Sequence, residues 1–386
     1  MIKSELTEKP PINWVNMLLF TITPALALTI VPLYGFFYGY DVFEWSLFLL
    51  YMGFCGISIT AGYHRLWSHK TYQAHAFVRL IFAIGGACAL QNDVFNWASD
   101  HRRHHQHVDD NAHDPYSAGR GFWFSHIGWI LRDYDSSPND FSNIQDLQKD
   151  PILQWQHKNY LALVIITNVL FPALVGFLHG DIAASMLLVG LLRLVLSQHA
   201  TYLINSIAHI WGRQPYSDKS SARDNSIIAL ITYGEGYHNY HHTFQWDYRN
   251  GISWWHYDPT KWLIKSLALC GLATGLKKVT AEKIEEAKVK MQYQKITQNS
   301  TSVELSSHLH KKLDKEYQQL LSVLDEWAER RKAWLDCKTS EMKGRINKID
   351  RHRLKIRYKE GSKNLKARKR EWDLMLRNLP RLKLAG

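Results

Sequence analysis

Nine histidines in this sequence stand at spacings that suit metal binding. Eight lie in the motifs HRLWSH, HRRHH and HNYHH and one stands alone; they are His64, His69, His101, His104, His105, His209, His238, His241 and His242. Imidazole is a common ligand of iron, copper, zinc and nickel, and nine imidazoles are too many for one tetrahedral site. The sequence therefore predicts a centre of two adjacent metals.

The spacing within each motif indicates how two metals could be served. In HRRHH and HNYHH the histidines stand at i, i+3 and i+4, which places all three on one helical face. His64 and His69 are five residues apart, about 140° on an ideal helix. We therefore expect either that the helix unwinds at this motif or that His64 and His69 serve different metals. His209, four residues after Asn205, would by itself be a core residue, but its depth matches that of His64, because both lie just past a hydrophobic segment.

Four long apolar segments must position these histidines: residues 14–38, 42–62, 161–178 and 183–204. About 20 apolar residues are needed to cross a hydrocarbon core of ~30 Å, so each segment predicts a transmembrane helix. For the first segment, a cleaved signal peptide is the alternative. It is disfavoured because the apolar stretch is too long and no small-residue cleavage site follows.

The charges between these segments predict the orientation of the chain. The two short connections, around Asp41 and at 179–181, carry no Lys or Arg, whereas residues 64–160 carry several. The positive-inside rule then places residues 64–160 and both termini in the cytoplasm. All nine histidines fall on that side, and we expect a multi-pass protein of a bacterial inner membrane.

The last hundred residues have a different character. Residues 281–386 contain 27 Lys and Arg against 15 Asp and Glu, a net charge of +12. This segment therefore accounts for the net charge of +12 of the whole chain. A 4,3 spacing, typical of a coiled-coil seam, runs through Leu313, Tyr317, Leu320, Leu324, Trp327, Arg331 and Trp334, and resumes at Met342, Ile346 and Ile349. We predict a membrane domain at 1–280 and a basic helical, coiled-coil tail at 281–386, with a linker at 297–303.

The partner of that tail is left open by the sequence. A single solvated amphipathic helix, self-association and packing on the membrane domain are all compatible with the seam. The basic stretch 366–370 suits anionic lipid or nucleic acid, and lipid is the simpler partner for a membrane protein.

The ligand set favours iron as the metal. Ligands that are nearly all imidazole exclude magnesium and calcium, and zinc would need fewer of them. Zinc could still fill the site in overproduced protein, because nitrogen ligands bind zinc more tightly than ferrous iron. HExxH is absent from the sequence, so a zinc protease would lack its general base.

Residues 10–280 resemble the membrane-bound fatty acyl desaturases of the Δ9, stearoyl-CoA desaturase type. The motifs that carry the resemblance are TAGYHRLWSH, WASDHRRHH, DPYSAGRGFWFSHIGW, NSIAHIWGRQPY and GEGYHNYHHTFQWDYR. The resemblance implies an all-α fold of four transmembrane helices under a cytosolic helical cap. It also implies that the nine histidines bind two iron ions, that Asn205 approaches one iron through a water, and that O2 is a co-substrate. The implied reaction inserts a cis double bond into a saturated acyl chain.

Several residues near the motifs are candidates for binding the substrate. We expect contacts from Trp97, Asp100, Arg102, Trp129 and Arg132. Trp123 and Trp254 are further candidates for a substrate tunnel, Arg103 and Arg120 for phosphate contacts, and Asp100 and Glu235 for orienting ligand imidazoles.

The carrier of the acyl chain is less certain, because the sequence departs from the family at two positions. Ser99 and Asp133 stand where relatives that use acyl-CoA usually carry basic residues. Phospholipid and acyl carrier protein therefore stand beside CoA as expected carriers. The chain also lacks HPGG, the signature of a fused cytochrome b5. We expect a separate electron donor, either a ferredoxin, a cytochrome b5 or a reductase.

Three other functions compete with desaturation. A histidine-box hydroxylase or related oxygenase would share the metals, and the HRLWSH and NSIAH motifs favour a desaturase over it. A metal transporter would place its histidines within the spans. A membrane scaffold would explain the tail but would leave nine histidines without a role.

Overall fold

The computed structural model describes residues 9–138, 140–299, 307–342 and 347–383, almost entirely as helices. The chain divides into two compact units. Unit 1 comprises residues 1–214 and 218–278, and unit 2 comprises residues 215–217 and 279–386.

Unit 1 contains four helices that are long and apolar enough to cross a membrane, at Trp14–Phe37, Val42–Ser68, Tyr160–His179 and Ile182–Ile210. They are built from α1 (Trp14–Phe37), α2 and η1 (Val42–Ile57, Ser58–Ser68), α7, η5 and α8 (Tyr160–Ile165, Ile166–Leu170, Phe171–His179), and α9, η6, α10 and α11 (Ile182–Ser185, Met186–Leu192, Arg193–Asn205, Ile207–Ile210). The prediction of four transmembrane helices is confirmed. The protein is a mostly helical membrane protein.

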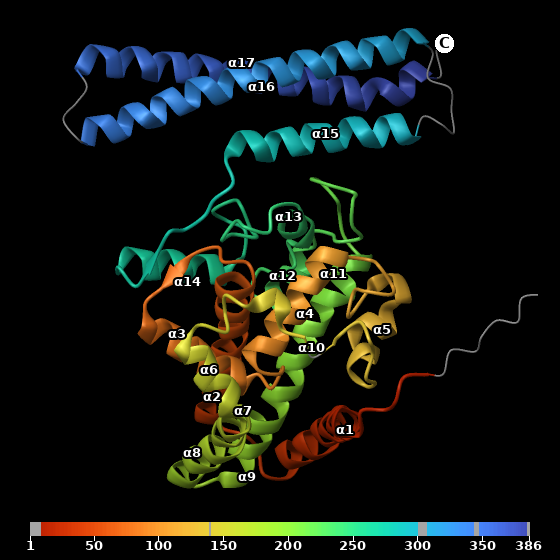
Figure 1. Ribbon diagram of the computed structural model, residues 1–386, viewed down its shortest axis with the longest axis vertical. Coiled ribbons are helices and arrows are strands. Elements are labelled where there is room, and N and C mark those ends of the chain that lie inside the picture. Colours follow the sequence, from red (N-terminus) through yellow and green to blue (C-terminus); the bar gives the residue numbers. More distant parts are fainter. Residues whose placement is uncertain (1–8, 139, 300–306, 343–346, 384–386) are drawn as a thin grey trace, which may run out of the picture. The chain divides into compact units, whose positions relative to one another are not determined.

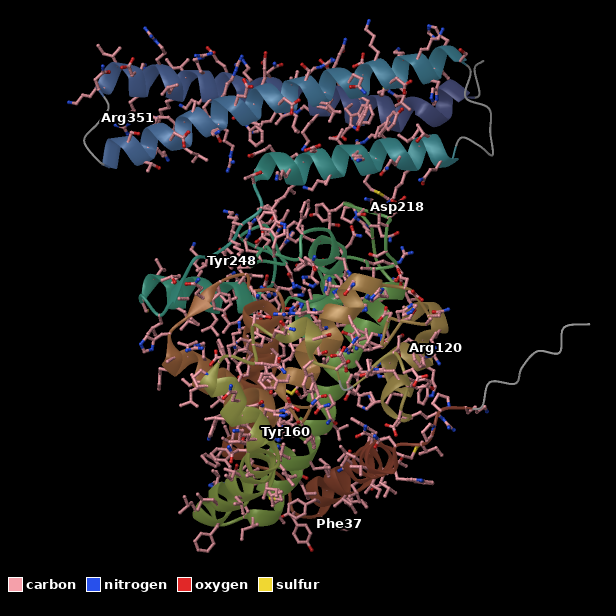
Figure 2. All side chains as sticks on the ribbon, viewed as in Figure 1. Phe37, Arg120, Tyr160, Asp218, Tyr248 and Arg351 are labelled. Atoms are coloured by element: carbon pink, nitrogen blue, oxygen red, sulfur yellow. The ribbon has the colours of Figure 1, made fainter. Side chains whose placement is uncertain are left out.

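The other elements of unit 1 form a helical cap at one end of the spans (Figure 1). They are α3 (Ala76–Cys88), α4 (Val94–His107), η2 (Ala118–Arg120), α5 (Phe122–His126), η3 (Gly128–Ile130), η4 (Ser142–Ile144), α6 (Pro151–Lys158), α12 (Ser226–Ile231), α13 (His238–Thr243), α14 (Pro259–Leu269) and the paired strands β1 (Gln73–Ala74) and β2 (Ala273–Thr274). Figure 2 shows Tyr248 at the cap end and Phe37 at the opposite end of unit 1, with Tyr160 between them. The histidine motifs lie at the cap end of the spans.

Local chemistry fixes where the key cap helix starts. The carboxylate of Asp93 accepts hydrogen bonds from the backbone N–H groups of Phe95 and Asn96, at 2.9 and 3.4 Å, and so caps the N-terminus of α4. From this start, α4 carries all three histidines of HRRHH.

The second span ends in a π-helix, η1, in which all residues are buried. The backbone N–H of His69 donates to the carbonyl of His64 at 3.1 Å, a hydrogen bond across five residues. A π-helix therefore brings residues five apart to the same side. The expected unwinding of HRLWSH takes the form of a π-helix, and the alternative, that His64 and His69 serve different metals, does not match their placement.

Unit 2 consists of α15 (Ala281–Asn299), α16 (Ser307–Met342) and α17 (Lys348–Lys383). Its core joins all three helices through Val289, Leu313, Leu320, Leu324, Trp327, Leu365 and Trp372. The predicted seam of α16 thus packs on helices of the same unit, an arrangement that the sequence analysis did not foresee. Ile349 is 73% exposed, and Ile346 and the side chain of Met342 lie outside the described residues. The linker prediction is wrong at 297–299, which belong to α15, and residues 300–303 are not described.

Candidate metal centre

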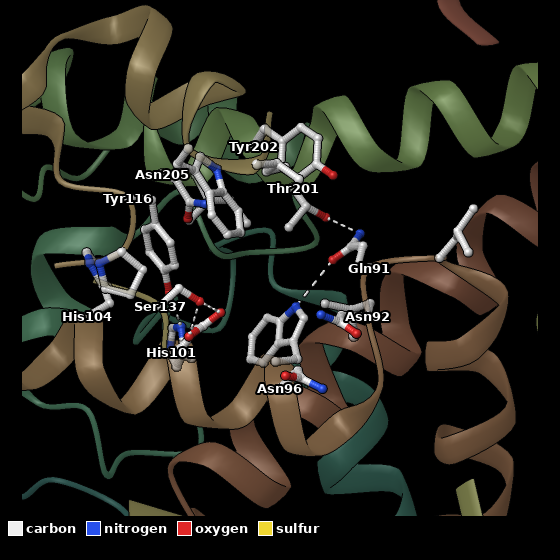
Figure 3. Close-up of a pocket in the computed structure, with 18 of the residues that line it drawn as sticks. Gln91, Asn92, Asn96, His101, His104, Tyr116, Ser137, Thr201, Tyr202 and Asn205 are labelled. Atoms are coloured by element: carbon white, nitrogen blue, oxygen red, sulfur yellow. Dashed lines mark hydrogen bonds between the residues drawn. The ribbon is translucent and has the colours of Figure 1, made fainter. Parts of the chain in front are cut away.

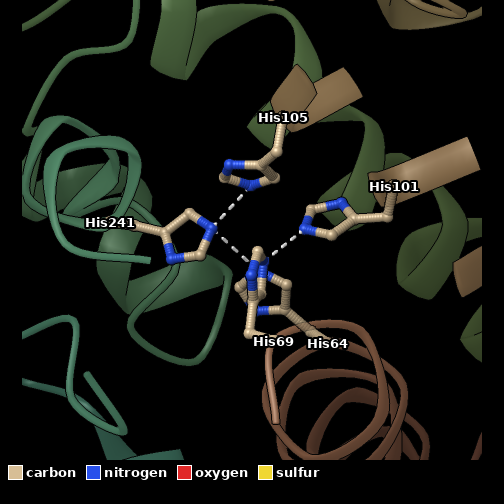
Figure 4. Close-up of side chains that lie close together, drawn as sticks. All are labelled: His64, His69, His101, His105 and His241. Atoms are coloured by element: carbon tan, nitrogen blue, oxygen red, sulfur yellow. Dashed lines mark hydrogen bonds between the residues drawn. The ribbon is translucent and has the colours of Figure 1, made fainter. Parts of the chain in front are cut away.

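Five histidines converge on one point in unit 1 (Figure 4). Their ligand atoms lie within 4.8 Å of one another. The Nε2 atom of His241 lies 3.1 Å from that of His64 and 2.9 Å from that of His105, and His69 and His101 approach to 2.8 Å. The π-helix, α4 and α13 supply these side chains.

The other four histidines form a second cluster, whose ligand atoms also lie within 4.8 Å of one another. The Nε2 atom of His238 lies 3.1 Å from those of His209 and His242, and His104 lies 3.4 Å from His242. Each i, i+3, i+4 triplet is therefore divided between the clusters. One helix face serves two adjacent sites, as the spacing predicts.

Carboxylates hold the outer nitrogens of two of these imidazoles. The Nδ1 atom of His64 lies 2.9 Å from Oε2 of Glu235, and the Nδ1 atom of His104 lies 2.9 Å from Oδ1 of Asp114. The Nδ1–H of His104 donates to Asp114, which leaves its Nε2 unprotonated and aimed at the cluster. The close contact of Glu235 with Nδ1 of His64 favours the same tautomer there. This is the arrangement that a metal ligand requires.

Further outer partners were missed by the sequence analysis. The hydroxyl of Tyr116 lies 3.2 Å from Nδ1 of His101. The hydroxyl of Ser221 lies 2.7 Å from Nδ1 of His209 and donates to Asp109 at 2.5 Å. Tyr116 and Ser221 lie in loops 15 and 12 residues after these histidines, and no helical period relates the two positions to their partners. Of the two carboxylates expected to orient imidazoles, Glu235 does so.

Asp100, the other expected carboxylate, is engaged elsewhere. It accepts hydrogen bonds from the hydroxyl of Ser137 at 2.8 Å and pairs with Arg103 at 3.1 Å. Burial raises the pKa of Asp100 to about 6, against the lowering effect of these two partners. The prediction that Asp100 orients a ligand imidazole does not match this geometry.

A buried ionic network surrounds Glu235. Its Oε1 atom accepts hydrogen bonds from Arg65 at 2.8 and 3.2 Å, and its Oε2 atom accepts one from Asn250 at 2.6 Å. Arg65 also pairs with Asp258 at 3.1 Å. Burial alone would raise the pKa of Glu235, but the Arg65 charge outweighs it and holds the pKa at about 2. Glu235 is therefore a carboxylate at neutral pH.

Six of these imidazoles are held in the neutral form. Burial, reinforced by neighbouring histidines, holds the pKa well below its ordinary value for His69, His101, His105, His238, His241 and His242. Neutral imidazole is the form that binds metals. The donor set fits two transition-metal ions and does not fit the hard cations magnesium and calcium.

A cavity of about 680 Å³ opens onto both clusters, because His64, His101, His104 and His238 all line it. Figure 3 shows His101, His104, Tyr116 and Asn205 facing this space. Its lining also includes Asn13, Arg132 and Asp133, as well as Gly56 and Tyr233. Gln91 donates to Thr201 at 2.8 Å and accepts from the Trp97 indole at 3.4 Å, and these bonds link the turn before α4 to α10.

Four of the five predicted substrate contacts line this cavity, namely Trp97, Asp100, Trp129 and Arg132. Arg102 lies outside it. Its guanidinium instead makes two hydrogen bonds to Asp146, at 2.7 and 3.0 Å. Trp123 and Trp254 also lie outside the lining and are 67% and 83% exposed.

The residues considered for phosphate recognition are placed as follows. Ser99 is buried, and its hydroxyl donates to Asn143 at 2.8 Å. Arg103 is engaged with Asp100 and with the carbonyl of Asp140. Arg120 lies over the Phe124 ring, 3.5 Å from its centroid. Arg132 and Asp133 are the members of this group that line the cavity.

Comparison with known proteins agrees with this geometry. The family model described as fatty acid desaturase matches residues 43–271. Over 298 residues the chain is 40% identical to acyl-CoA desaturase 1 of Saccharomyces cerevisiae, covering 76% of this chain and 57% of that protein. It is 39% identical to a probable acyl-CoA desaturase of Schizosaccharomyces pombe, covering 74% of this chain and 58% of that protein. Stearoyl-CoA desaturase 5 of Bos taurus is 39% identical, with 63% of this chain and 75% of the relative covered.

The matches cover different shares of this chain and of its relatives. The chain spans less than two thirds of the length of the two yeast relatives and three quarters of the bovine one. The family model, in contrast, covers more than half of this chain and includes every histidine of both clusters. The chain therefore belongs to the fatty acid desaturase family.

Proposed function

We propose that this protein is an O2-dependent di-iron desaturase that inserts a cis double bond, at the Δ9 position, into a saturated fatty acyl chain. One observation carries the proposal: two adjacent histidine clusters share one cavity of about 680 Å³. Family membership favours this function over the hydroxylase and scaffold alternatives.

Iron is the metal that we propose for both clusters. The nine imidazoles supply four or five nitrogens to each ion, with Asn205 on the cavity wall as a water-mediated partner of one of them. Iron, when bound, supplies the activation of O2 that removes hydrogen from unactivated methylenes. The histidines and their carboxylate partners hold the ions, and the buried surroundings exclude bulk water.

The cavity walls position the acyl chain in this proposal. The Trp97 indole stacks on the His101 ring, with ring centroids 4.9 Å apart, so one wall of the cavity lies directly against the five-histidine cluster. Gln91 fixes the Trp97 indole and Thr201 with respect to each other. An acyl chain that follows this wall passes the ligand histidines, which is where the reaction must occur.

For the acyl carrier, we propose CoA. The relatives are named as acyl-CoA or stearoyl-CoA desaturases, and the buried, hydrogen-bonded position of Ser99 removes one of the two arguments against CoA. Arg132, on the cavity lining, is a cation available for a phosphate. Saturable use of stearoyl-CoA by the purified protein would exclude phospholipid and acyl carrier protein as required carriers.

We further propose that the cap and both termini face the cytoplasm and that a separate protein donates the electrons. The proposal of orientation rests on the distribution of Lys and Arg in the sequence. The bacterial inner membrane gains no support from the relatives described above, which come from yeasts and a mammal.

Expression in a desaturase-deficient host tests the proposed function. Fatty acid profiling by mass spectrometry should show a cis-Δ9 monounsaturated product, and the purified protein should contain iron. His104→Ala is the matched control, because it removes one ligand from a cluster. A hydroxylated product would favour the oxygenase alternative, and a protein with neither product nor iron would favour the scaffold.

A further inference from the structure

The positive charge of the chain is concentrated on one helix of unit 2. The sequence of α17, residues 348–383, contains fourteen Lys and Arg and four Asp and Glu, whereas α16, residues 307–342, contains seven of each. The net charge of the whole chain is +12. The basic excess is therefore a property of α17 and not of the helical bundle in general.

Three large apolar side chains on one side of α17 are exposed. Ile349, Ile356 and Leu374 are 73%, 42% and 57% exposed. They are separated by 7 and 18 residues, which are nearly whole numbers of helical turns, so the three lie on the same side. Leu365 and Trp372 are buried in the core of unit 2 and lie on the opposite side of the helix. The apolar stripe therefore faces away from the bundle core.

Basic side chains flank this stripe. Arg353, Lys363 and Arg370 are exposed and lie within about 60° of it on a helical projection. Glu360 and Glu371 are exposed acidic residues on the same side. We name this surface the α17 face; it consists of Ile349, Arg353, Ile356, Lys363, Arg370 and Leu374.

We propose that the α17 face binds the surface of an anionic lipid bilayer. An exposed apolar stripe flanked by Lys and Arg is the pattern of helices that lie in a membrane interface. The apolar residues enter the headgroup boundary, and the cations meet lipid phosphates. A nucleic acid or an acidic protein would satisfy the charges but would give Ile349, Ile356 and Leu374 no apolar environment.

A bilayer is also the partner that is always present. Unit 1 contains four membrane-spanning helices, so every functional molecule is embedded in lipid. The link between the units keeps unit 2 at a high effective concentration near the membrane surface. A face of modest intrinsic affinity can therefore be occupied, and its occupancy depends on the anionic lipid content.

The test uses the full-length chain in nanodiscs. A spin label is placed on the α17 face by Ala367→Cys in a Cys270→Ser background, because Ala367 and Cys270 are both exposed. Collisions with oxygen, which concentrates in the bilayer, are compared with collisions with a water-soluble nickel chelate. In nanodiscs with phosphatidylglycerol the label should become protected from the chelate, and in pure phosphatidylcholine it should remain accessible.

Matched variants separate the α17 face from general charge. The variant R353Q/K363Q/R370Q should lower the partition of the face into anionic bilayers about a hundredfold, since each cation contributes about fivefold. The variant K311Q/K315Q/K332Q removes the same charge from exposed positions of α16 and should leave the protection unchanged.

Three results would overturn the proposal. Protection that is independent of lipid charge, or that both triple variants lower equally, would show that the α17 face has no specific role. Spin–spin broadening at Ala367→Cys without lipid dependence would show that a second copy of the chain covers the face. Protection by an acidic protein or by nucleic acid, but not by anionic lipid, would assign the face to that partner.

Discussion

Glu235→Gln should weaken metal binding while it leaves the shape of the site intact. Glutamine is isosteric with glutamate but cannot accept at both ends, so it places an N–H₂ group either toward Arg65 or toward Asn250 and His64. The Nδ1–H of His64 then loses its carboxylate. Loss of such an outer partner costs 10–100-fold in metal affinity, or about 1.4 to 2.7 kcal/mol.

The same substitution should also lower the free energy of unfolding. Breaking a buried ion pair by removing one partner costs about 3 to 5 kcal/mol. We expect about 3 kcal/mol here, because Arg65 retains Asp258 at 3.1 Å. Asp247→Asn is a matched control, since Asp247 is a buried carboxylate that pairs with Arg249 at 2.7 Å. The control should lose stability but keep the partner of His64.

The assay compares iron affinity and thermal unfolding of the purified variants. Iron affinity is measured by chelator competition, and desaturation is measured on the iron-loaded protein. The reasoning would be refuted if folded Glu235→Gln protein bound iron as tightly as the wild type, or if Asp247→Asn weakened iron binding by the same factor.

Four further predictions follow from the same geometry. His104→Ala should abolish desaturation without loss of membrane insertion, and Asn205→Ala should lower activity less; equal activity of His104→Ala and wild type would contradict the ligand assignment. A Cβ at Gly56 would lie 2.0 Å from the Tyr233 ring, so Gly56→Ala should narrow the cavity there and shift the products toward shorter chains in mass spectrometry. Unchanged chain lengths would show that the acyl chain does not reach Gly56. Burial lowers the pKa of Lys261 to about 8; because the unfolded lysine keeps its proton to about pH 10, stability should rise between pH 8 and 10, and Lys261→Met should lack this rise in thermal unfolding. Truncation after Thr280 should preserve iron binding and desaturation, and loss of iron from a truncated protein that still inserts would contradict the proposed separation of the two modules.

The sequence was most informative where a short period maps directly onto a helix. Apolar runs of about 20 residues predicted the four spans, and i, i+3, i+4 spacing predicted that one face of α4 would serve two sites. These predictions depend only on local geometry. The placement of His64 and His69 in one cluster was not predictable in this way. It follows from a π-helix, and no side-chain pattern in the sequence indicates its five-residue hydrogen bonds.

Contacts between loop residues and the histidines, and contacts between helices, were not predictable in the same way. Asp114 and Ser221 orient ligand imidazoles from loops, where no periodicity relates them to the histidines. The seam of α16 was recognised, but a 4,3 spacing identifies an apolar stripe without its partner. Its packing on α15 and α17 involves residues of other helices, which the seam does not encode.

The division of the histidines links metal binding to the folding of unit 1. Each cluster combines side chains from the end of a span with side chains from the cap: His64 with His241 in one, and His209 with His238 in the other. Without a metal, neutral imidazoles that face one another at about 3 Å have few protons to share, so their contacts contribute little to stability. A bound ion replaces these contacts with bonds that bridge span and cap, and its binding free energy becomes part of the folding free energy. The carboxylates behind the imidazoles, by fixing the ring orientation before the ion arrives, lower the cost of this step, because less side-chain freedom is lost on binding.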